Sequence, residues 1–334
     1  MTKDELILRR ITGHHLLMPS ETQTVVQDLC GVQAQFLGHA LQGLAFRCHE
    51  VHTDGLIKTW SIRGTMHLFS VQDLPIFLHE GRSHFLRPID TLETDRYINA
   101  KRKAYFADLI VEAIHNGIDE RQAIKEACQN AGMTNLESKS IFDPWGGTIR
   151  ALCEAGRICH KVQEKKSYQI CPPFEPMDEH AAGLELTRRY FTHFGPATVK
   201  DAATFFGLTQ SKIKTWMQQL PLSEAVYDGK VYYYINEKIP ERNIPDCLFL
   251  AGFDQLMLGY EKTESLMVPL EHMRQIYTLS GIIRPVILVN GEVVGWWNFK
   301  NSKLQITLFC PADKQIITET AAKLWPTLSQ IVYL

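Results

Sequence analysis

The stretch GPATVKDAATFFGLTQSKIKTWMQQLPLSEAVYDGKVYYYI at residues 195–235 decides the fold class. It holds two short helical stripes of apolar residues, and Thr198 and Thr209 stand where each helix would be capped. A glycine separates the two helices. Two alternating apolar runs then flank Asp228-Gly229, a pair typical of a two-residue hairpin turn. Helix, turn, helix and hairpin in this order predict a winged helix.

Two further units of similar order are expected upstream. In the second unit, a helix that Asp119 can cap is followed by a helix over residues 148–156 and a hairpin over residues 157–171. The first unit is more diverged: Ser20 begins a capping-box pattern, and a helix around residues 53–62 precedes a short apolar strand. We therefore expect three winged-helix units, at residues 1–90, 91–180 and 181–240.

From about residue 241 the character of the sequence changes to β. Three nearly continuous apolar runs follow, and Asn290-Gly291 between the first two predicts a tight hairpin turn. Such runs are typical of a small sheet that is closed or buried on both sides. A helix over residues 312–333 is expected to end the chain. The predicted fold class is therefore α+β, with tandem winged-helix (helix-turn-helix) units followed by a small C-terminal β-barrel at residues 241–334.

Composition excludes several classes of protein. Of the 334 residues, 45% are hydrophobic and 22% are charged, which is typical of a globular protein with more than one domain. The net charge is −2, so any contact with DNA must come from a folded basic surface. The longest stretch free of Asp, Glu, Lys and Arg is residues 29–46, and its glutamines and glycines predict no membrane span. We expect a cytoplasmic protein.

Cofactor and metal chemistry have no recognisable motif. The sequence contains no phosphate-binding G-x-x-x-x-G-K-[ST] loop, no dinucleotide-binding glycine pattern and no H-E-x-x-H helix. The eight cysteines are scattered without a C-x-x-C pair, which favours reduced thiols over zinc ligands. His14 and His15 adjoin on a predicted helix, where neighbouring side chains point about 100° apart, so a packed or exposed pair is favoured over a metal site. We expect no metal and no cofactor, including no nucleotide cofactor.

Gln33 and Gln35 are the strongest candidates for a functional site. They lie in CGVQAQFLGH, residues 30–39, directly after a glycine that should end a helix. If the backbone there is extended, the side chains of residues i and i+2 project to the same side, and two carboxamides converge in an apolar setting. The alternative is that each glutamine merely satisfies buried backbone groups.

Basic side chains on the predicted winged helices are the candidates for contact with DNA phosphates. They are Lys200, Lys212 and Lys214 in the third unit, and Arg188 and Arg189 on the helix before it. A solvated helix face is the alternative for each of them.

Two further charged residues lie near the apolar motifs. Arg63 is a candidate for bracing a phosphate through paired hydrogen bonds, or for pairing with Asp28 or Asp73 to hold the fold. Asp254, in an apolar setting, is interpreted as a helix cap or buried hydrogen-bond acceptor in preference to a catalytic base.

Taken together, these motifs resemble the bacterial winged-helix DNA glycosylases of the AlkZ/YcaQ type. The resemblance runs across nearly the whole chain in the right order. It rests on GVQAQ at 31–35, WSIRGTMHL at 60–68, GPAT at 195–198 with Asp201, Phe253-Asp254 with LGY at 258–260, and Ile283-Arg284-Pro285 followed by Gly291 and Gly295-Trp296.

The resemblance implies tandem winged helices and a β-barrel that clamp duplex DNA as a monomer. It further implies excision of N7-alkylated guanine and unhooking of interstrand crosslinks made through such bases. In the azinomycin-resistance branch a Gln-aliphatic-Gln motif is catalytic, and Gln33, Ala34 and Gln35 match it. The YcaQ branch carries Asp at the second glutamine position, and this chain departs from that pattern. The partner expected is therefore double-stranded DNA carrying an alkylated guanine.

Neutral amides make chemical sense with such a substrate. A carboxamide takes up no proton, but it can accept a hydrogen bond from water and orient it. A guanine alkylated at N7 already carries positive charge, which weakens its glycosidic bond. A non-catalytic DNA-binding regulator and a protein-binding scaffold are the alternatives, since winged helices also serve both roles.

Overall fold

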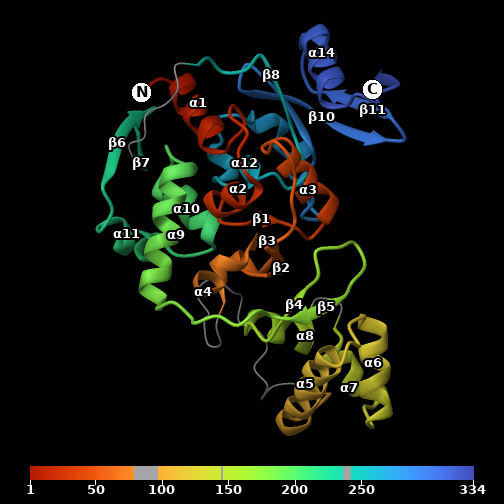
Figure 1. The fold of residues 1–334 in the computed structure, drawn as a ribbon. Helices are drawn as coiled ribbons and strands as arrows, with labels where there is room; N and C mark the ends of the chain where they lie inside the picture. Colours follow the sequence, from red (N-terminus) through yellow and green to blue (C-terminus); the bar gives the residue numbers. More distant parts are fainter. Residues whose placement is uncertain (79–96, 144–145, 236–241) are drawn as a thin grey trace. The chain divides into compact units, whose positions relative to one another are not determined.

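The chain divides into two units, one of which is discontinuous in sequence. The computed structural model describes residues 1–78, 97–143, 146–235 and 242–334. Unit 1 comprises Met1–His52 and Leu184–Leu334, and unit 2 comprises Thr53–Gly183 (Figure 1). The fold is mixed α+β. Of the three predicted domain boundaries, those at residues 90 and 240 lie outside the described residues, and the four-part division stays a prediction.

Unit 1 holds the helices of the N-terminal and C-terminal parts of the chain, and α9 begins just before its second segment. They are α1 (Lys3–Gly13), α2 (Thr22–Asp28), α3 (Leu37–Ala45), α9 (Glu179–His193), α10 (Val199–Phe206), α11 (Gln210–Met217), α12 (Gln255–Leu258), α13 (Met273–Ile276) and α14 (Lys314–Leu324). Its strands are β1 (Val32–Gln33), β6 (Leu222–Tyr227), β7 (Lys230–Ile235), β8 (Cys247–Leu250), β9 (Val286–Val289), β10 (Glu292–Lys300), β11 (Lys303–Leu308) and β12 (Gln330–Tyr333).

The elements predicted for residues 195–235 are confirmed. Thr198 caps α10 in a reciprocal capping box with Asp201, and Gly207 ends that helix in the left-handed conformation with φ +68°. Thr209 caps α11 by accepting a hydrogen bond from the backbone N–H of Lys212. β6 and β7 pair in antiparallel register around Asp228-Gly229, where both residues have positive φ as a type I′ turn requires.

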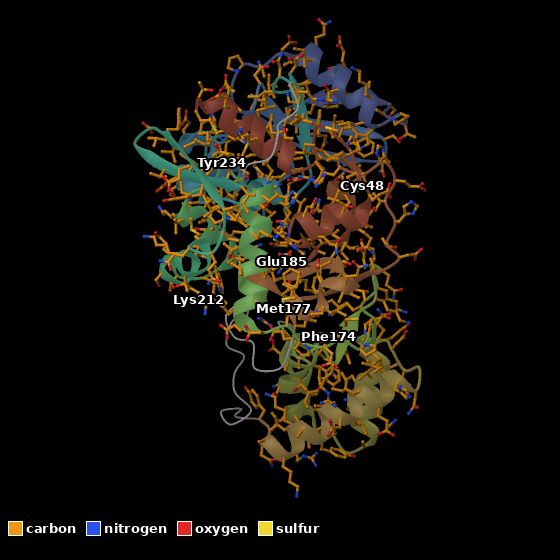
Figure 2. The ribbon with its side chains drawn as sticks, turned by 60° about the vertical axis from the view of Figure 1, so that its left-hand side comes forward. Cys48, Phe174, Met177, Glu185, Lys212 and Tyr234 are labelled. Carbon is orange, nitrogen blue, oxygen red and sulfur yellow. The ribbon has the colours of Figure 1, made fainter. Side chains whose placement is uncertain are left out.

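Aromatic side chains dock this segment onto the rest of unit 1. Tyr190 of α9 and Phe194, which directly follows that helix, stack with their ring centroids 4.9 Å apart, and both rings contact Phe205 of α10. The Tyr190 hydroxyl donates to the carbonyl of Gly259 at 2.7 Å. Figure 2 labels Glu185 on α9, Lys212 on α11 and Tyr234 on β7.

The C-terminal residues form a five-stranded sheet in the order β12-β11-β10-β9-β8. The turn at Asn290-Gly291 has positive φ at both residues, as predicted. Trp297 of β10 is buried and donates from its indole N–H to the carbonyl of Leu250. Among the described residues β8 and β12 stand at the two edges of this sheet, so the predicted closed barrel is not found. The predicted terminal helix is also shorter: α14 ends at Leu324, and Gln330–Tyr333 forms β12, parallel to β11.

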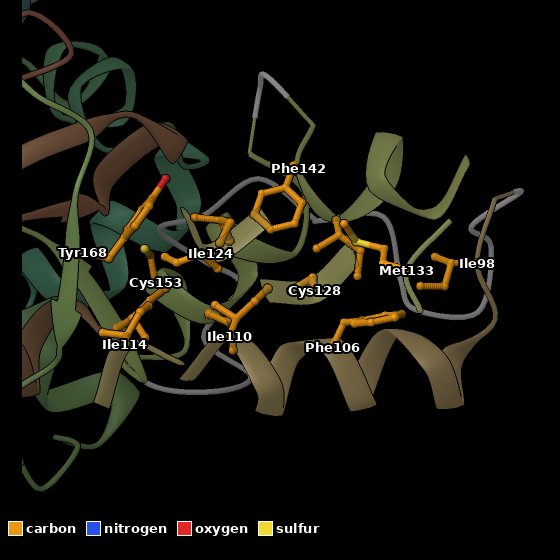
Figure 3. Packing of buried hydrophobic residues seen from close by; sticks show 14 residues of the cluster. Ile98, Phe106, Ile110, Ile114, Ile124, Cys128, Met133, Phe142, Cys153 and Tyr168 are labelled. Carbon is orange, nitrogen blue, oxygen red and sulfur yellow. The ribbon is translucent and has the colours of Figure 1, made fainter. Parts of the chain in front are cut away.

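Unit 2 combines a small antiparallel sheet with a helical bundle. Its helices are α4 (Leu74–Phe77), α5 (Ala100–His115), α6 (Arg121–Asn130), α7 (Asn135–Ile141) and α8 (Gly147–Glu154). Its strands β2 (Leu56–Trp60), β3 (Met66–Ser70), β4 (Ile158–His160) and β5 (Tyr168–Ile170) are ordered β3-β2-β4-β5. Figure 3 shows the core of the bundle, where Phe106 and Ile110 of α5 face Cys128, Met133 and Phe142.

Three local predictions were wrong. Residues 53–62 hold strand β2 instead of a helix, because four consecutive buried residues suit a strand covered on both faces. Ser20 does not cap α2: Glu21 occupies the N-cap position, and the backbone of Ser20 bridges to Cys48. Asp119 does not cap α6, because its carboxylate accepts hydrogen bonds from Lys161 and Ser167.

A buried ion pair joins two segments of unit 1 that lie far apart in the sequence. The guanidinium of Arg47 makes two hydrogen bonds to the carboxylate of Asp254, at 2.7 and 2.9 Å. It also donates to the carbonyls of His14 and Gly43. Asp254 in turn caps α12 by accepting from the backbone N–H of Leu256. The prediction that Asp254 is a cap and buried acceptor is therefore confirmed.

Two histidines of the unit 2 sheet are buried without a charge partner. The rings of His67 and His160 are at most 4% exposed, and the Nε2 atom of each has no hydrogen-bond partner among the described residues. Burial, assisted by the charges of Arg63 and Lys58 respectively, lowers the pKa of each ring to about 3. Both rings are neutral in the folded protein at pH 5 to 8.

In none of the ranges that the structure describes is a helix long and apolar enough to cross a bilayer.

Asp254→Ala is expected to lower the free energy of unfolding by about 3 to 5 kcal/mol, because it leaves the Arg47 guanidinium buried and unpaired. Urea denaturation followed by circular dichroism measures the change. The control is Asp108→Ala, which removes a surface ion pair with Arg157. The side chains of Asp108 and Arg157 are 72% and 41% exposed, so this substitution should change stability by less than about 1 kcal/mol. Equal effects of the two substitutions would contradict this assignment.

Acidification is expected to destabilise unit 2 through its neutral histidines. Between pH 6.5 and about 3 the unfolded chain binds protons that His160 in the folded chain does not, so stability falls as the pH falls. At pH 5 one such ring costs roughly 2 kcal/mol. The variant His160→Phe keeps a ring against Trp60 and Tyr168 and should lose about that much less stability than the wild type between pH 7 and pH 5 in urea denaturation. An unchanged pH dependence would mean that His160 is not the group responsible.

Candidate active site

The two glutamines lie on a loop whose path is set by two left-handed residues. Helix α2 ends at Asp28, and Cys30 and Gly31 follow with φ of +53° and +82°. The chain then extends as β1, which carries Gln33. Two successive positive φ values reverse the chain sharply, so the segment leaves α2 as extended backbone. We call Leu29–Phe36 the glutamine loop.

The carboxamides of Gln33 and Gln35 meet, as the sequence predicts. The Nε2 atom of Gln33 donates to Oε1 of Gln35 at 3.0 Å. Gln33 is buried, with 6% of its surface exposed, whereas Gln35 is exposed. The pair therefore forms a polar group with one buried member that holds the other at the surface.

A third glutamine anchors the loop from below. The side-chain amide of Gln255, at the start of α12, donates to the carbonyl of Gly31 at 2.6 Å. Its Oε1 atom is buried and has no hydrogen-bond partner among the described residues. Because Asp254 caps the same helix and binds Arg47, the ion pair and the loop anchor share one short element.

Aromatic residues flank the exposed glutamine. Phe36 is half exposed, and its ring stacks on Phe253 with centroids 5.3 Å apart. Phe253 has a left-handed backbone with φ +56°. His39 packs its ring against both phenylalanines and against Gly252, and burial lowers its pKa. Phe36, which directly follows Gln35 in the chain, therefore forms a hydrophobic platform together with Phe253.

The cavity under the glutamine loop is small. It has a volume of about 10 Å³ and is lined by Leu29, Val32, His39, Phe253 and Gln255, among others. A space of that size holds about one water molecule. This cavity admits no nucleobase.

Arg63 lies in unit 2, at the tip of the β2–β3 hairpin. It adopts a left-handed conformation with φ +58° within the 3₁₀ turn Ile62–Gly64. The turn is closed by a hydrogen bond from the backbone N–H of Ser61 to the carbonyl of Thr65 and by one from the N–H of Thr65 to the carbonyl of Ile62. Nδ1 of the buried His67 lies 3.1 Å from the Ser61 hydroxyl oxygen. Burial lowers the pKa of Arg63 to about 10, so it remains a cation at neutral pH. Its proposed role at a phosphate stays a prediction.

Three of the predicted phosphate ligands already have acidic partners. Arg188 and Arg189 both bind the carboxylate of Glu185, at 2.8 and 2.7 Å. Lys200 binds Glu264 at 2.6 Å. These side chains fit the alternative of charged helix faces balanced within the fold.

The other two lysines lie on α11. Lys214 is exposed. Lys212 is half buried and holds its ammonium group 5.2 Å from the centre of the Trp216 ring, a cation–π contact. Contact of either lysine with DNA stays a prediction.

Sequence reasoning missed Arg47, Gln255 and Phe36. Arg47 directly follows the long uncharged stretch 29–46, and such a position is a signal for a buried, paired charge. Gln255 stands inside the conspicuous segment GFDQLMLGY beside Asp254, which could have drawn attention to it. Phe36 adjoins Gln35, but no pattern in the sequence predicts that its ring is exposed.

Comparison with known proteins adds to this geometry. The chain is 24% identical to an interstrand DNA cross-link repair glycosylase from Streptomyces sahachiroi, over 87% of this chain and 85% of that protein. Its fold is similar to that of the solved Streptomyces sahachiroi DNA glycosylase AlkZ, with a TM-score of 0.80 and 19% identity over 100% of this chain and 99% of the other. The model of the family described as DNA glycosylase AlkZ-like matches residues 26–324, which include the glutamine loop, α12 and strands β8 to β11 of the C-terminal sheet. The chain thus belongs to the AlkZ-like DNA glycosylase family.

Proposed function

We propose that this enzyme hydrolyses the N-glycosidic bond of N7-alkylguanine in duplex DNA, with Gln33 and Gln35 at the reacting sugar. The single observation that carries the proposal is the 3.0 Å contact between the two carboxamides, with Gln35 exposed. Interstrand crosslinks made through such guanines are further proposed substrates, in keeping with the name of the Streptomyces relative.

The chemistry matches two neutral amides. The alkylated base leaves as a neutral molecule, so it needs no acid to protonate it, and positive charge moves to the sugar as the bond breaks. The Oε1 atom of Gln35 accepts from Gln33 and has a second lone pair, which can orient an attacking water. An amide oxygen near C1′ also stabilises the developing positive charge. Undamaged purines lack the activated leaving group and should not react.

The small cavity argues for attack at the surface of the duplex. A space of about 10 Å³ does not hold a flipped base. We therefore propose that the lesion meets the exposed side of the glutamine loop, where Gln35 and Phe36 lie. An exposed site of this kind is compatible with bulky adducts and crosslinks.

For DNA binding, we propose the segment α10, α11, β6 and β7 as a winged helix. Its element order is that of the motif, and Lys214 of α11 is exposed. The upstream units, at residues 1–90 and 91–180, are proposed as further winged helices. A monomer suffices for the contacts proposed.

Gln33→Ala and Gln35→Ala are each expected to lower the rate of N7-methylguanine excision from duplex DNA by about 100- to 1000-fold, the typical effect of removing one group that stabilises charge in the transition state. The rate is measured with enzyme in excess, by alkaline cleavage of the abasic product. The loss of rate in the double variant, relative to the wild type, should be smaller than the product of the two single losses, because the two amides act as a unit.

Gln315→Ala is the matched control, since Gln315 is an exposed glutamine on α14 and should leave the rate unchanged. Excision that persists at the wild-type rate in both loop variants would refute the catalytic role. A wild-type protein that excises neither N7-methylguanine nor a crosslink, but is retained on one undamaged sequence, would instead support the non-catalytic regulator.

Phe36→Ala is expected to weaken binding to lesion-containing duplex about tenfold, because stacking of an aromatic side chain on a base or sugar contributes on the order of 1 to 3 kcal/mol. Phe36→Tyr keeps the ring against Phe253 and should bind like the wild type. Fluorescence anisotropy with a labelled duplex measures both affinities. Equal affinities of the Ala and Tyr variants would exclude a stacking role for Phe36.

A further inference from the structure

Three side chains that ligate metals meet at the ends of three helices in unit 1. His15 directly follows the C-cap of α1, Asp28 is the last residue of α2, and His193 is the last residue of α9. The Nε2 atom of His15 lies 2.8 Å from Oδ2 of Asp28, and Nε2 of His193 lies 3.2 Å from Oδ1 of the same carboxylate. The three ligand atoms all lie within 4.8 Å of one another.

The local backbone brings His15 to this cluster and takes His14 away from it. His15 has a left-handed conformation with φ +57°, which is unusual for a residue with a side chain. His14 is fully buried, and its ring packs edge-on against Phe194 at 4.5 Å. The two adjacent histidines therefore serve different sites, and the sequence-based argument against a joint metal site holds only for that pair.

Close packing of α1 on α9 holds the cluster together. A Cβ atom on Gly13 would lie 2.2 Å from the carbonyl oxygen of His193, so the two helix ends touch through their backbones. The ring of His193 also makes a hydrogen bond with the backbone of Gly13. Metal-binding histidines commonly use such an outer hydrogen bond to fix the orientation of the ring.

From this geometry we propose that His15, Asp28 and His193 form a binding site for a divalent transition metal ion of the zinc type. In a tetrahedral site with bonds of about 2.0 Å, neighbouring ligand atoms lie about 3.3 Å apart. Two of the three separations are within 0.5 Å of that value as they stand. Two imidazoles and one carboxylate are a ligand set that suits zinc, copper, nickel and iron better than magnesium or calcium.

The surroundings leave the ligands available. The side chains of His15, Asp28 and His193 are 16%, 23% and 16% exposed, which allows an ion to enter and a water molecule to serve as the fourth ligand.

A metal here would tie the end of α2 to α1 and α9. Asp28 directly precedes the glutamine loop, so the ion would restrain the segment from which that loop leaves α2. The role assigned is therefore structural, and it is independent of the reaction proposed for Gln33 and Gln35.

Zinc titration of the full chain tests the proposal. The chain is first stripped with a chelator and carries Cys310→Ser, because Cys310 is an exposed free thiol and thiolates are zinc ligands. One Zn²⁺ per chain is expected, measured by competition with a zinc indicator, together with a rise of the thermal midpoint. Co²⁺ in place of zinc should give the visible d–d absorption of a tetrahedral nitrogen and oxygen site.

Asp28→Asn, His15→Ala and His193→Ala should each weaken zinc binding at least tenfold and abolish the cobalt spectrum. Asp28→Asn is the most informative, because it keeps the size of the side chain but replaces the carboxylate by a neutral amide, which is a poor metal ligand. His52→Ala is the control: His52 and Glu50 form an exposed pair that should not contribute. Circular dichroism of the metal-free variants checks that they fold.

Two results would overturn the site. One is the absence of stoichiometric zinc and cobalt binding to the folded wild-type chain, which would leave the cluster as a pair of imidazole–carboxylate hydrogen bonds. The other is binding that all three substitutions leave unchanged. Either result leaves the glycosylase assay of the Gln33 and Gln35 variants unaffected, so the two proposals fail separately.

Discussion

The hydrogen-bonded pair of Arg47 and Asp254 is the interaction on which unit 1 depends. Both side chains are buried. Neither charge would be stable in the interior without the other, since an unpaired buried charge costs several kcal/mol. The pair links the end of α3 to the cap of α12, and the next residue, Gln255, binds the carbonyl of Gly31. One ion pair thereby connects the N-terminal helices, the segment before the C-terminal sheet and the loop that carries the two glutamines.

The glutamine loop shows how a site can be built from backbone conformation. Cys30 and Gly31 turn the chain, the extended segment that follows places residues 33 and 35 on one side, and the buried amide of Gln33 holds that of Gln35. Neither amide changes charge between pH 5 and 8, so the rate of the proposed reaction at the lesion should depend on the charge of the base and not on titration of these residues. This is a physical reason for an enzyme of this kind to be selective for damaged bases.

Several basic side chains that are candidates for DNA contact are paired with acids within the fold. Arg188 and Arg189 share Glu185, and Lys200 shares Glu264 with Lys230. Hydrogen bonds from the two lysines lower the pKa of Glu264. Any basic surface that meets DNA must therefore be assembled from the remaining cations, or these pairs must exchange their carboxylates for phosphates. Both routes predict weak non-specific binding at physiological salt.

The sequence by itself determined the elements whose signals are local. The caps of α10 and α11, the turns at Asp228-Gly229 and Asn290-Gly291, and the convergence of Gln33 and Gln35 all depend on residues close in the chain, and all are confirmed. Only the tertiary structure decided the rest. Residues 56–60 form a strand because they pair with β3 and β4 and are buried on both faces. Arg47 pairs with Asp254, which lies 207 positions away in the chain, and His15, Asp28 and His193 come together from the ends of three helices. Such pairings depend on how distant segments pack, and no period or spacing along a single chain encodes them.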